Sequence, residues 1–124
     1  MNKAAIQAEL ETILRNLVQS GYRCYSTTKG AWGYIITPSD NVLSIQRDTY
    51  EFRGWTFSLA YVPGGNGSGC MCLEEPVQTV TAETVRQAES EGLSFAKSFG
   101  AKLYASSSAW HKNYWSKDCL QEIL

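Results

Sequence analysis

Histidine is scarce in this chain of 124 residues, which has only His111. Any Ser-His or Cys-His nucleophile pair would need this residue, and its neighbour Lys112 suggests a solvent-facing helix position. No acidic pair shows the spacing of a metal-dependent nuclease, and no cofactor-binding motif is present. The sequence therefore predicts a non-enzymatic protein with no catalytic residue, no cofactor and no metal site.

Long apolar runs are also lacking. No run approaches the roughly 18 residues that cross a bilayer, and Glu9 and Glu11 interrupt the first segment, where a signal peptide would be apolar throughout. We therefore expect a cytoplasmic protein with no membrane contact. There the 4 cysteines should be reduced thiols. Cys70 and Cys72 lack the usual Cys-x-x-Cys spacing of a zinc site, although with Cys24, Cys119 or His111 they could complete a tetrahedral one.

A basic stripe, the usual mark of a duplex-binding domain, is absent as well. From Asp48 to Glu91, seven acidic residues stand against two basic ones, so this segment carries a charge of −5 while the whole chain carries −1. Direct nucleic-acid binding is therefore not expected, although Arg23, Lys29 and Arg47 could form a local basic patch. An acidic segment instead favours a basic partner surface.

Composition and length predict one domain over residues 1–124. Hydrophobic residues make up 44% of the chain and charged residues 19%, which is ordinary for a globular protein. At this length folding can bury well over half of the surface that the unfolded chain exposes. Neither a metal nor a disulfide is needed for stability.

The first half of the chain predicts a helix followed by a meander of strands. Residues 3–19 carry apolar side chains at helical spacing and end before Gly21. Short β-rich runs divided by turn residues follow at 22–28, 32–37, 42–46, 53–62 and 70–76. They predict four or five antiparallel strands.

The second half predicts two more helices. Thr81 is the expected N-cap of the first, with Glu83 in its first turn. Its expected buried stripe is Val85, Ala88, Gly92, Phe95, Ala96 and Phe99. The tail SSSAWHKNYWSKDCLQEIL is expected to form the last helix, with Trp110, Tyr114 and Ile123 roughly in line. The predicted fold class is α+β, with an N-terminal helix, the meander, and two C-terminal helices packed on one face of the sheet.

The stretch PGGNGSG, residues 63–69, contains four of the 10 glycines. A phosphate-binding loop would require a following Lys and a helix, whereas the next element here is a predicted strand. The stretch is typical of a wide hairpin loop, since glycine supplies the positive φ that such loops need. Alternatively it is a recognition loop in which Asn66 and Ser68 offer hydrogen bonds.

Tryptophans supply two further candidate sites. Trp110 and Trp115 are five residues apart on the expected last helix and cannot point the same way, so one of them could be exposed as a contact residue. In the meander, Trp32, Tyr34 and Trp55 could stack a nucleotide base above the sheet. That second site defines the alternative function, sponge-like binding of a small molecule or nucleotide.

Two stretches, LSIQRDTYEFRGWTFSLAYVPGGNGSGCMCLEE and TVRQAESEGLSFAKSFGAKLYASSSAWHKNYW, resemble small proteins of phages and bacterial mobile elements. The shared pattern is a meander strand, a Gly-Ser-Gly turn, and a helix leading into a Leu-Tyr and a Trp. Such proteins include anti-CRISPR and other anti-defence inhibitors, which are compact and act by occupying a host protein. The resemblance implies a phage protein acting as an inhibitor through protein–protein interaction in the host bacterial cell.

The expected function is therefore inhibition of a host defence nuclease, such as a CRISPR effector, by protein–protein occlusion. The expected partner-binding residues are Glu74, Glu75, Glu83, Glu89, Asn66, Ser68, Trp110 and Trp115. A meander can leave an unpaired edge strand, so a homo-oligomer is left open.

Overall fold

The computed structural model describes residues 3–27, 32–47, 54–62, 69–72, 76–98, 100, 102–103 and 120–124. The helices in this part of the chain are α1 (Lys3–Gln19) and α2 (Ala82–Ser98). Its strands are β1 (Arg23–Thr27), β2 (Trp32–Ile36), β3 (Val42–Arg47), β4 (Trp55–Val62), β5 (Gly69–Cys72), β6 (Lys102–Leu103) and β7 (Leu120–Ile123). The predicted α+β class and the N-terminal helix are confirmed.

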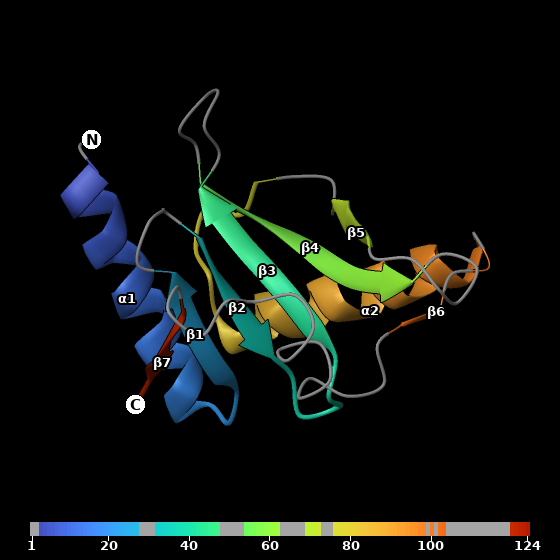
Figure 1. Cartoon of the computed structure of the whole chain (residues 1–124), viewed down its shortest axis with the longest axis horizontal. Helices are drawn as coiled ribbons and strands as arrows, with labels where there is room; N and C mark the ends of the chain where they lie inside the picture. Colours follow the sequence, from blue (N-terminus) through green and yellow to red (C-terminus); the bar gives the residue numbers. More distant parts are fainter. Residues whose placement is uncertain are drawn as a thin grey trace.

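Strands β1 to β5 form an antiparallel meander in which each strand pairs with the next. This confirms the predicted antiparallel meander, with five strands out of the expected four or five. Strand β7 pairs antiparallel with β1, and the short β6 pairs antiparallel with the C-terminal end of β4. Figure 1 shows the twisted sheet, whose strand order is β5-β4-β3-β2-β1-β7.

Helix α1 covers the predicted residues 3–19 and ends at Gly21, which has a φ of 97°. The Gly21 amide donates to the Val18 carbonyl at 3.1 Å, and the Tyr22 amide donates to the Leu17 carbonyl at 3.1 Å. This Schellman arrangement needs the left-handed conformation that glycine adopts readily. The buried stripe of the helix is Ile6, Leu10, Leu14 and Leu17.

Both helices pack on one face of the sheet, which we call the helix-covered face. Helix α1 contacts β1, β2 and β7, and α2 contacts β4 and β6, passing behind the central strands in Figure 1. The centre of this face is a row of directly paired residues with 0% exposure: Cys24, Ile35, Leu43 and Leu59.

Glycine is required at Gly33, where α1 approaches β2. A Cβ at this position would stand 2.6 Å from the Tyr25 carbonyl oxygen and 3.0 Å from Leu14 Cδ1. The first distance is to backbone, which cannot move aside as the end of a side chain can. Gly33 therefore sets how closely α1 packs on the sheet.

The predicted N-cap of α2 is confirmed. The Thr84 amide donates to Thr81 Oγ1 at 3.2 Å, while the Thr81 amide donates to Thr84 Oγ1 at 2.7 Å. These reciprocal bonds satisfy two amides near the helix start, as in a capping box. Glu83 lies in the first turn as expected.

The predicted buried stripe of α2 is correct in part. Val85, Ala88, Gly92 and Ala96 are buried. Phe95 is 46% exposed instead, and Glu89 is buried in the stripe. At about 100° per residue, Glu89 lies about 40° from Val85 around the helix, whereas Phe95 lies about 80° away on the other side. Phe99 is outside the described residues.

The prediction of a last helix extending to Ile123 is wrong at its end. Residues 120–123 form strand β7, with Ile123 buried opposite Cys24 of β1. A helix would have placed Ile123 with Trp110 and Tyr114, which lie outside the described residues. Pairing with an edge strand satisfies the backbone groups of β1, and this non-local gain outweighs the local helical pattern.

Candidate binding surface

An exposed tryptophan lies on the sheet face opposite α1 and α2, here called the helix-free face because neither helix of the described residues lies on it. Trp32 is 42% exposed, and its ring contacts that of buried Tyr34, with centroids 5.6 Å apart and planes tilted by 56°. Strand alternation places both on this face, because Gly33 and Ile35 between and after them face α1 and the core. The Trp32 ring therefore packs against Tyr34 and is still accessible to solvent.

Two polar residues continue the row from Trp32 across β3 and β4. Gln46 of β3 pairs with Trp32 and is exposed. Thr56 of β4 pairs with Gln46, and its hydroxyl donates to the Gln46 carbonyl at 3.3 Å. Aromatic surface beside an exposed amide and a hydroxyl can contact a partner by both packing and hydrogen bonds.

A second row on the helix-free face runs through Tyr34 to an exposed carboxylate. Tyr34 pairs with Tyr25, and Tyr25 pairs with Glu122 of β7. Burial raises the pKa of Tyr25, the Glu122 carboxylate raises it further, and Arg23 lowers it in part. Tyr25 is therefore a neutral phenol at physiological pH. We call Trp32, Tyr34, Tyr25 and Glu122 the aromatic row.

The helix-covered face carries a different tryptophan. Trp55 is 1% exposed, and its indole Nε1 donates to Glu9 Oε1 of α1 at 2.9 Å. Arg47 Nη1 donates to the same oxygen at 3.2 Å, and its Cζ lies 5.8 Å from the Trp55 ring centroid. This cluster joins α1 to strands β3 and β4, so its role is structural.

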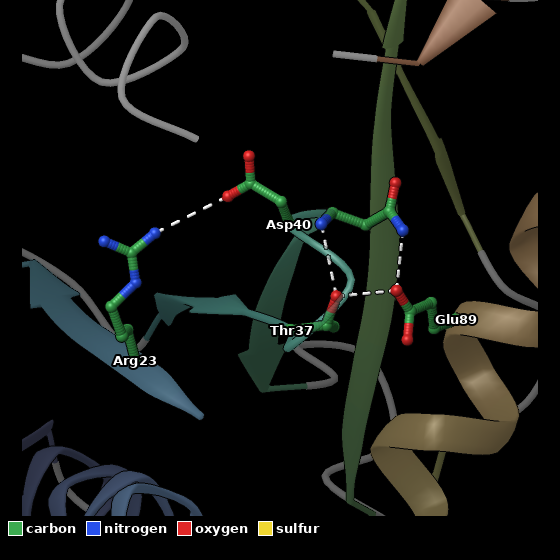
Figure 2. A network of polar contacts seen from close by, with 5 residues as sticks. Arg23, Thr37, Asp40 and Glu89 are labelled. Carbon is green, nitrogen blue, oxygen red and sulfur yellow. Dashed lines mark hydrogen bonds and ion pairs between the residues drawn. The ribbon is translucent and has the colours of Figure 1, made fainter. Parts of the chain in front are cut away.

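Glu89 joins α2 to the turn between β2 and β3 (Figure 2). Its Oε1 accepts the Thr37 hydroxyl at 2.6 Å and the Asn41 side-chain amide at 2.7 Å. The Asn41 backbone amide donates in turn to Thr37 Oγ1 at 3.1 Å. Beyond the turn, Arg23 and Asp40 form a more exposed ion pair at 3.6 Å.

The structure does not bring together the three expected base-stacking residues. Trp32 and Tyr34 share the helix-free face, whereas Trp55 lies on the other face beneath α1. The residues paired with Trp32 and Trp55 on β3 are Gln46 and Arg47, which are adjacent and so point to opposite faces. A ligand cannot stack on all three rings, and Trp55 is removed from the candidate site.

The expected acidic contact residues are also separated. Glu83 is exposed in the first turn of α2, but Glu89 is only 8% exposed and occupied by Thr37 and Asn41. Glu89 is therefore a structural residue. The other expected contact residues lie outside the described part of the chain: Glu74, Glu75, Asn66, Ser68, Trp110 and Trp115.

The outer side of α2 has mixed charge. A shallow hollow there is lined by Glu83, Arg86, Gln87, Ser90 and Glu91. The Glu91 carboxylate accepts a hydrogen bond from Gln87 Nε2 at 3.1 Å. The positive charge of Arg86 offsets part of the negative charge of Glu83 and Glu91. The described part of this helix is less acidic at its surface than the sequence segment suggests.

Cys24 is an unreactive thiol. It lies in the core, and burial raises its pKa to about 12, so the nucleophilic thiolate is not formed near neutral pH. Within the described residues, no group of three or more metal-ligating side chains comes together.

Sequence reasoning missed Glu9, Arg47 and Glu89 as partners across the sheet. The signal for Glu89 was its spacing of four residues from Val85, which places it on the buried side of α2. The partners of Glu9 had no local signal, because Arg47 and Trp55 lie 38 and 46 residues away in sequence.

Comparisons with protein-family models, with curated proteins and with solved structures found no significant match to this chain. Among the described residues, neither helix is sufficiently long and apolar to span a bilayer.

Proposed function

We propose that this chain is a non-enzymatic binding protein that inhibits a bacterial defence nuclease by occupying its surface, in the manner of an anti-CRISPR protein. Its place of action is the cytoplasm of the bacterial host. The observation that carries the proposal is Trp32, 42% exposed on the helix-free face and packed against buried Tyr34. The resemblance to small phage and mobile-element proteins supplies the partner class.

An exposed, well-supported tryptophan favours tight protein binding for two reasons. Trp is enriched among interface residues whose truncation costs the most affinity. Because Tyr34 and strand β2 already restrict the Trp32 ring, less side-chain freedom is lost on binding. The exposed amide of Gln46 provides a polar neighbour at the edge of such a contact.

The acidic segment between Asp48 and Glu91 has a separate role in the proposal. Its charge of −5 steers the chain toward the basic nucleic-acid channel of a nuclease and raises the association rate. Glu74, Glu75, Glu83, Asn66, Ser68, Trp110 and Trp115 remain proposed contact residues, whereas Glu89 does not.

The test is a plaque assay in bacteria whose CRISPR nuclease targets the infecting phage. Expression of the chain should raise plaque numbers by at least an order of magnitude, and Trp32→Ala should remove most of this rescue. Phe95→Ala is the matched control, because Phe95 is similarly exposed at 46% but lies on α2. Absence of rescue across a panel of CRISPR and restriction nucleases would contradict the proposal.

The exposed Trp32 ring also favours the alternative, a nucleotide-binding anti-defence protein in which a base stacks on Trp32 alone. A bound nucleotide would raise the melting temperature through a stabilisation of RT ln(1 + [L]/Kd). Thermal shifts across a nucleotide panel test this alternative, with Trp32→Ala expected to remove the shift. A flat response of the wild-type protein counts against it.

A further inference from the structure

The aromatic row places an indole and a carboxylate at two ends of one surface. From Trp32 to Tyr34 is two residues along β2, and from Tyr34 through Tyr25 to Glu122 is two strand spacings. These steps are about 7 Å along the strand and about 10 Å across the sheet. Trp32 and Glu122 are both exposed, so one partner segment can reach both.

Among the described residues, the charged side chains beside the aromatic row are Glu122, Asp40 and Arg23, two acidic and one basic. Glu122 forms no ion pair with any residue in the described part of the chain. Arg23, on the same face of β1, is held by Asp40 at 3.6 Å and is therefore partly neutralised. Glu122 raises the pKa of Tyr25 more than Arg23 lowers it, so both charges act on the aromatic row and the carboxylate has the larger influence.

Electron-rich ring faces beside a carboxylate suit a cation better than an anion. Arginine fits best, because its planar guanidinium stacks on Trp and Tyr rings and forms paired hydrogen bonds to carboxylates. A phosphate group would be repelled by Glu122. The aromatic row should therefore bind a basic protein segment in preference to a nucleotide.

The other face of the same sheet already contains this combination. Arg47 lies over the Trp55 ring at 5.8 Å and donates to Glu9 at 3.2 Å. That cluster lies within the chain, where it joins α1 to β3 and β4. The aromatic row has the corresponding tryptophan and glutamate at an exposed position.

We infer that Trp32 and Glu122, the exposed ends of the aromatic row, bind arginine side chains of the partner protein, while buried Tyr34 supports the Trp32 ring. The inference rests on the proposed inhibitor function and deepens it, since it assigns the partner surface as a basic, arginine-bearing one. Trp32 receives one guanidinium by stacking, and Glu122 receives a second cation of the same segment.

The experiment is an NMR titration of the full chain with a blocked hexa-arginine peptide. We expect the Trp32 indole N–H and the Tyr25 and Glu122 amides to shift. The Trp55 indole N–H, bonded to Glu9 in the core, serves as an internal control and should stay in place. Hexa-lysine should bind several-fold more weakly, because its ammonium groups are more strongly hydrated and do not stack.

Variants sharpen the result. Trp32→Ala should weaken hexa-arginine binding at least tenfold, and Glu122→Gln should weaken it about threefold and reduce its salt dependence. Phe95→Ala should leave it unchanged. Equal affinity of wild type, Trp32→Ala and Glu122→Gln overturns the inference, as do shifts by a nucleotide at Trp32 where hexa-arginine causes none.

The two proposals fail in different ways. Plaque rescue that depends on Trp32, without any response to hexa-arginine, would overturn only the arginine inference. Hexa-arginine binding at the aromatic row without plaque rescue would overturn the inhibitor function and leave arginine recognition supported.

Discussion

Trp32 and Trp55 lie on opposite faces of one sheet and illustrate two uses of the same side chain. Trp55 is 1% exposed, donates to Glu9 and has Arg47 over its ring. Trp32 is 42% exposed and rests on Tyr34. The first should therefore determine stability and the second binding, and each substitution below tests that division.

The largest effect is expected at Trp55. Trp55→Ala removes a fully buried ring and leaves Glu9 with one donor fewer, and should lower the free energy of unfolding by about 3–5 kcal/mol. Urea unfolding followed by circular dichroism measures the change. Trp55→Phe keeps most of the ring but loses the indole N–H, so its cost should be clearly smaller. A loss under about 1 kcal/mol for Trp55→Ala would break the comparison.

The second largest loss of stability is expected at Glu89, which like Trp55 is a buried structural residue and joins α2 to the turn between β2 and β3. Glu89→Ala leaves the Thr37 hydroxyl and the Asn41 amide without their shared acceptor, which should cost about 1–3 kcal/mol. Glu89→Gln retains an acceptor oxygen and is the matched control, with a smaller expected loss. Chemical denaturation of both variants provides the measurement, and equal losses would show that the acceptor is not what matters.

Glu9→Gln separates charge from hydrogen bonding in the cluster around Trp55. The amide oxygen can still accept from the Trp55 indole, while the charge that attracts Arg47 is lost. We expect a cost of about 1 kcal/mol. The difference from wild type should shrink at high salt, because the Glu9 side chain is 36% exposed and its charge is screened. A salt-independent difference would argue against an electrostatic cause.

The smallest effect on stability is expected at Trp32. Trp32→Ala should change the free energy of unfolding by no more than about 0.5–1 kcal/mol, although it is expected to weaken partner binding at least tenfold. Parallel unfolding and binding measurements on the same preparation test both halves. A large loss of stability in Trp32→Ala would show that Trp32, like Trp55, is a structural residue.

Much of the fold could be predicted because it depends on local patterns. The 3.6-residue spacing of α1, the Thr81 cap of α2 and the turn residues between strands each act over a few residues. Strand β7 could not be predicted, because its four residues pair with β1, about a hundred positions earlier in the chain. Local spacing there resembled a helix, and non-local pairing decided otherwise.

The candidate site shows the same limit. Exposure of Trp32 and burial of Trp55 depend on strand register, since their paired residues Gln46 and Arg47 are adjacent on β3. A shift of one residue would exchange the faces. Nor could the sequence reveal that the Glu89 carboxylate accepts hydrogen bonds from Thr37 and Asn41, which lie 52 and 48 residues away.

By itself, the sequence determined α1, the start of α2 and the meander strands, and which side chains share a face of each of them, because the backbone periods of 3.6 and 2 are local properties. Only the tertiary structure decided which face each element turns toward the helices. That choice depends on register, on the close approach at Gly33 and on partners distant in sequence. It is what makes Trp55 part of the core and leaves Trp32 at the surface.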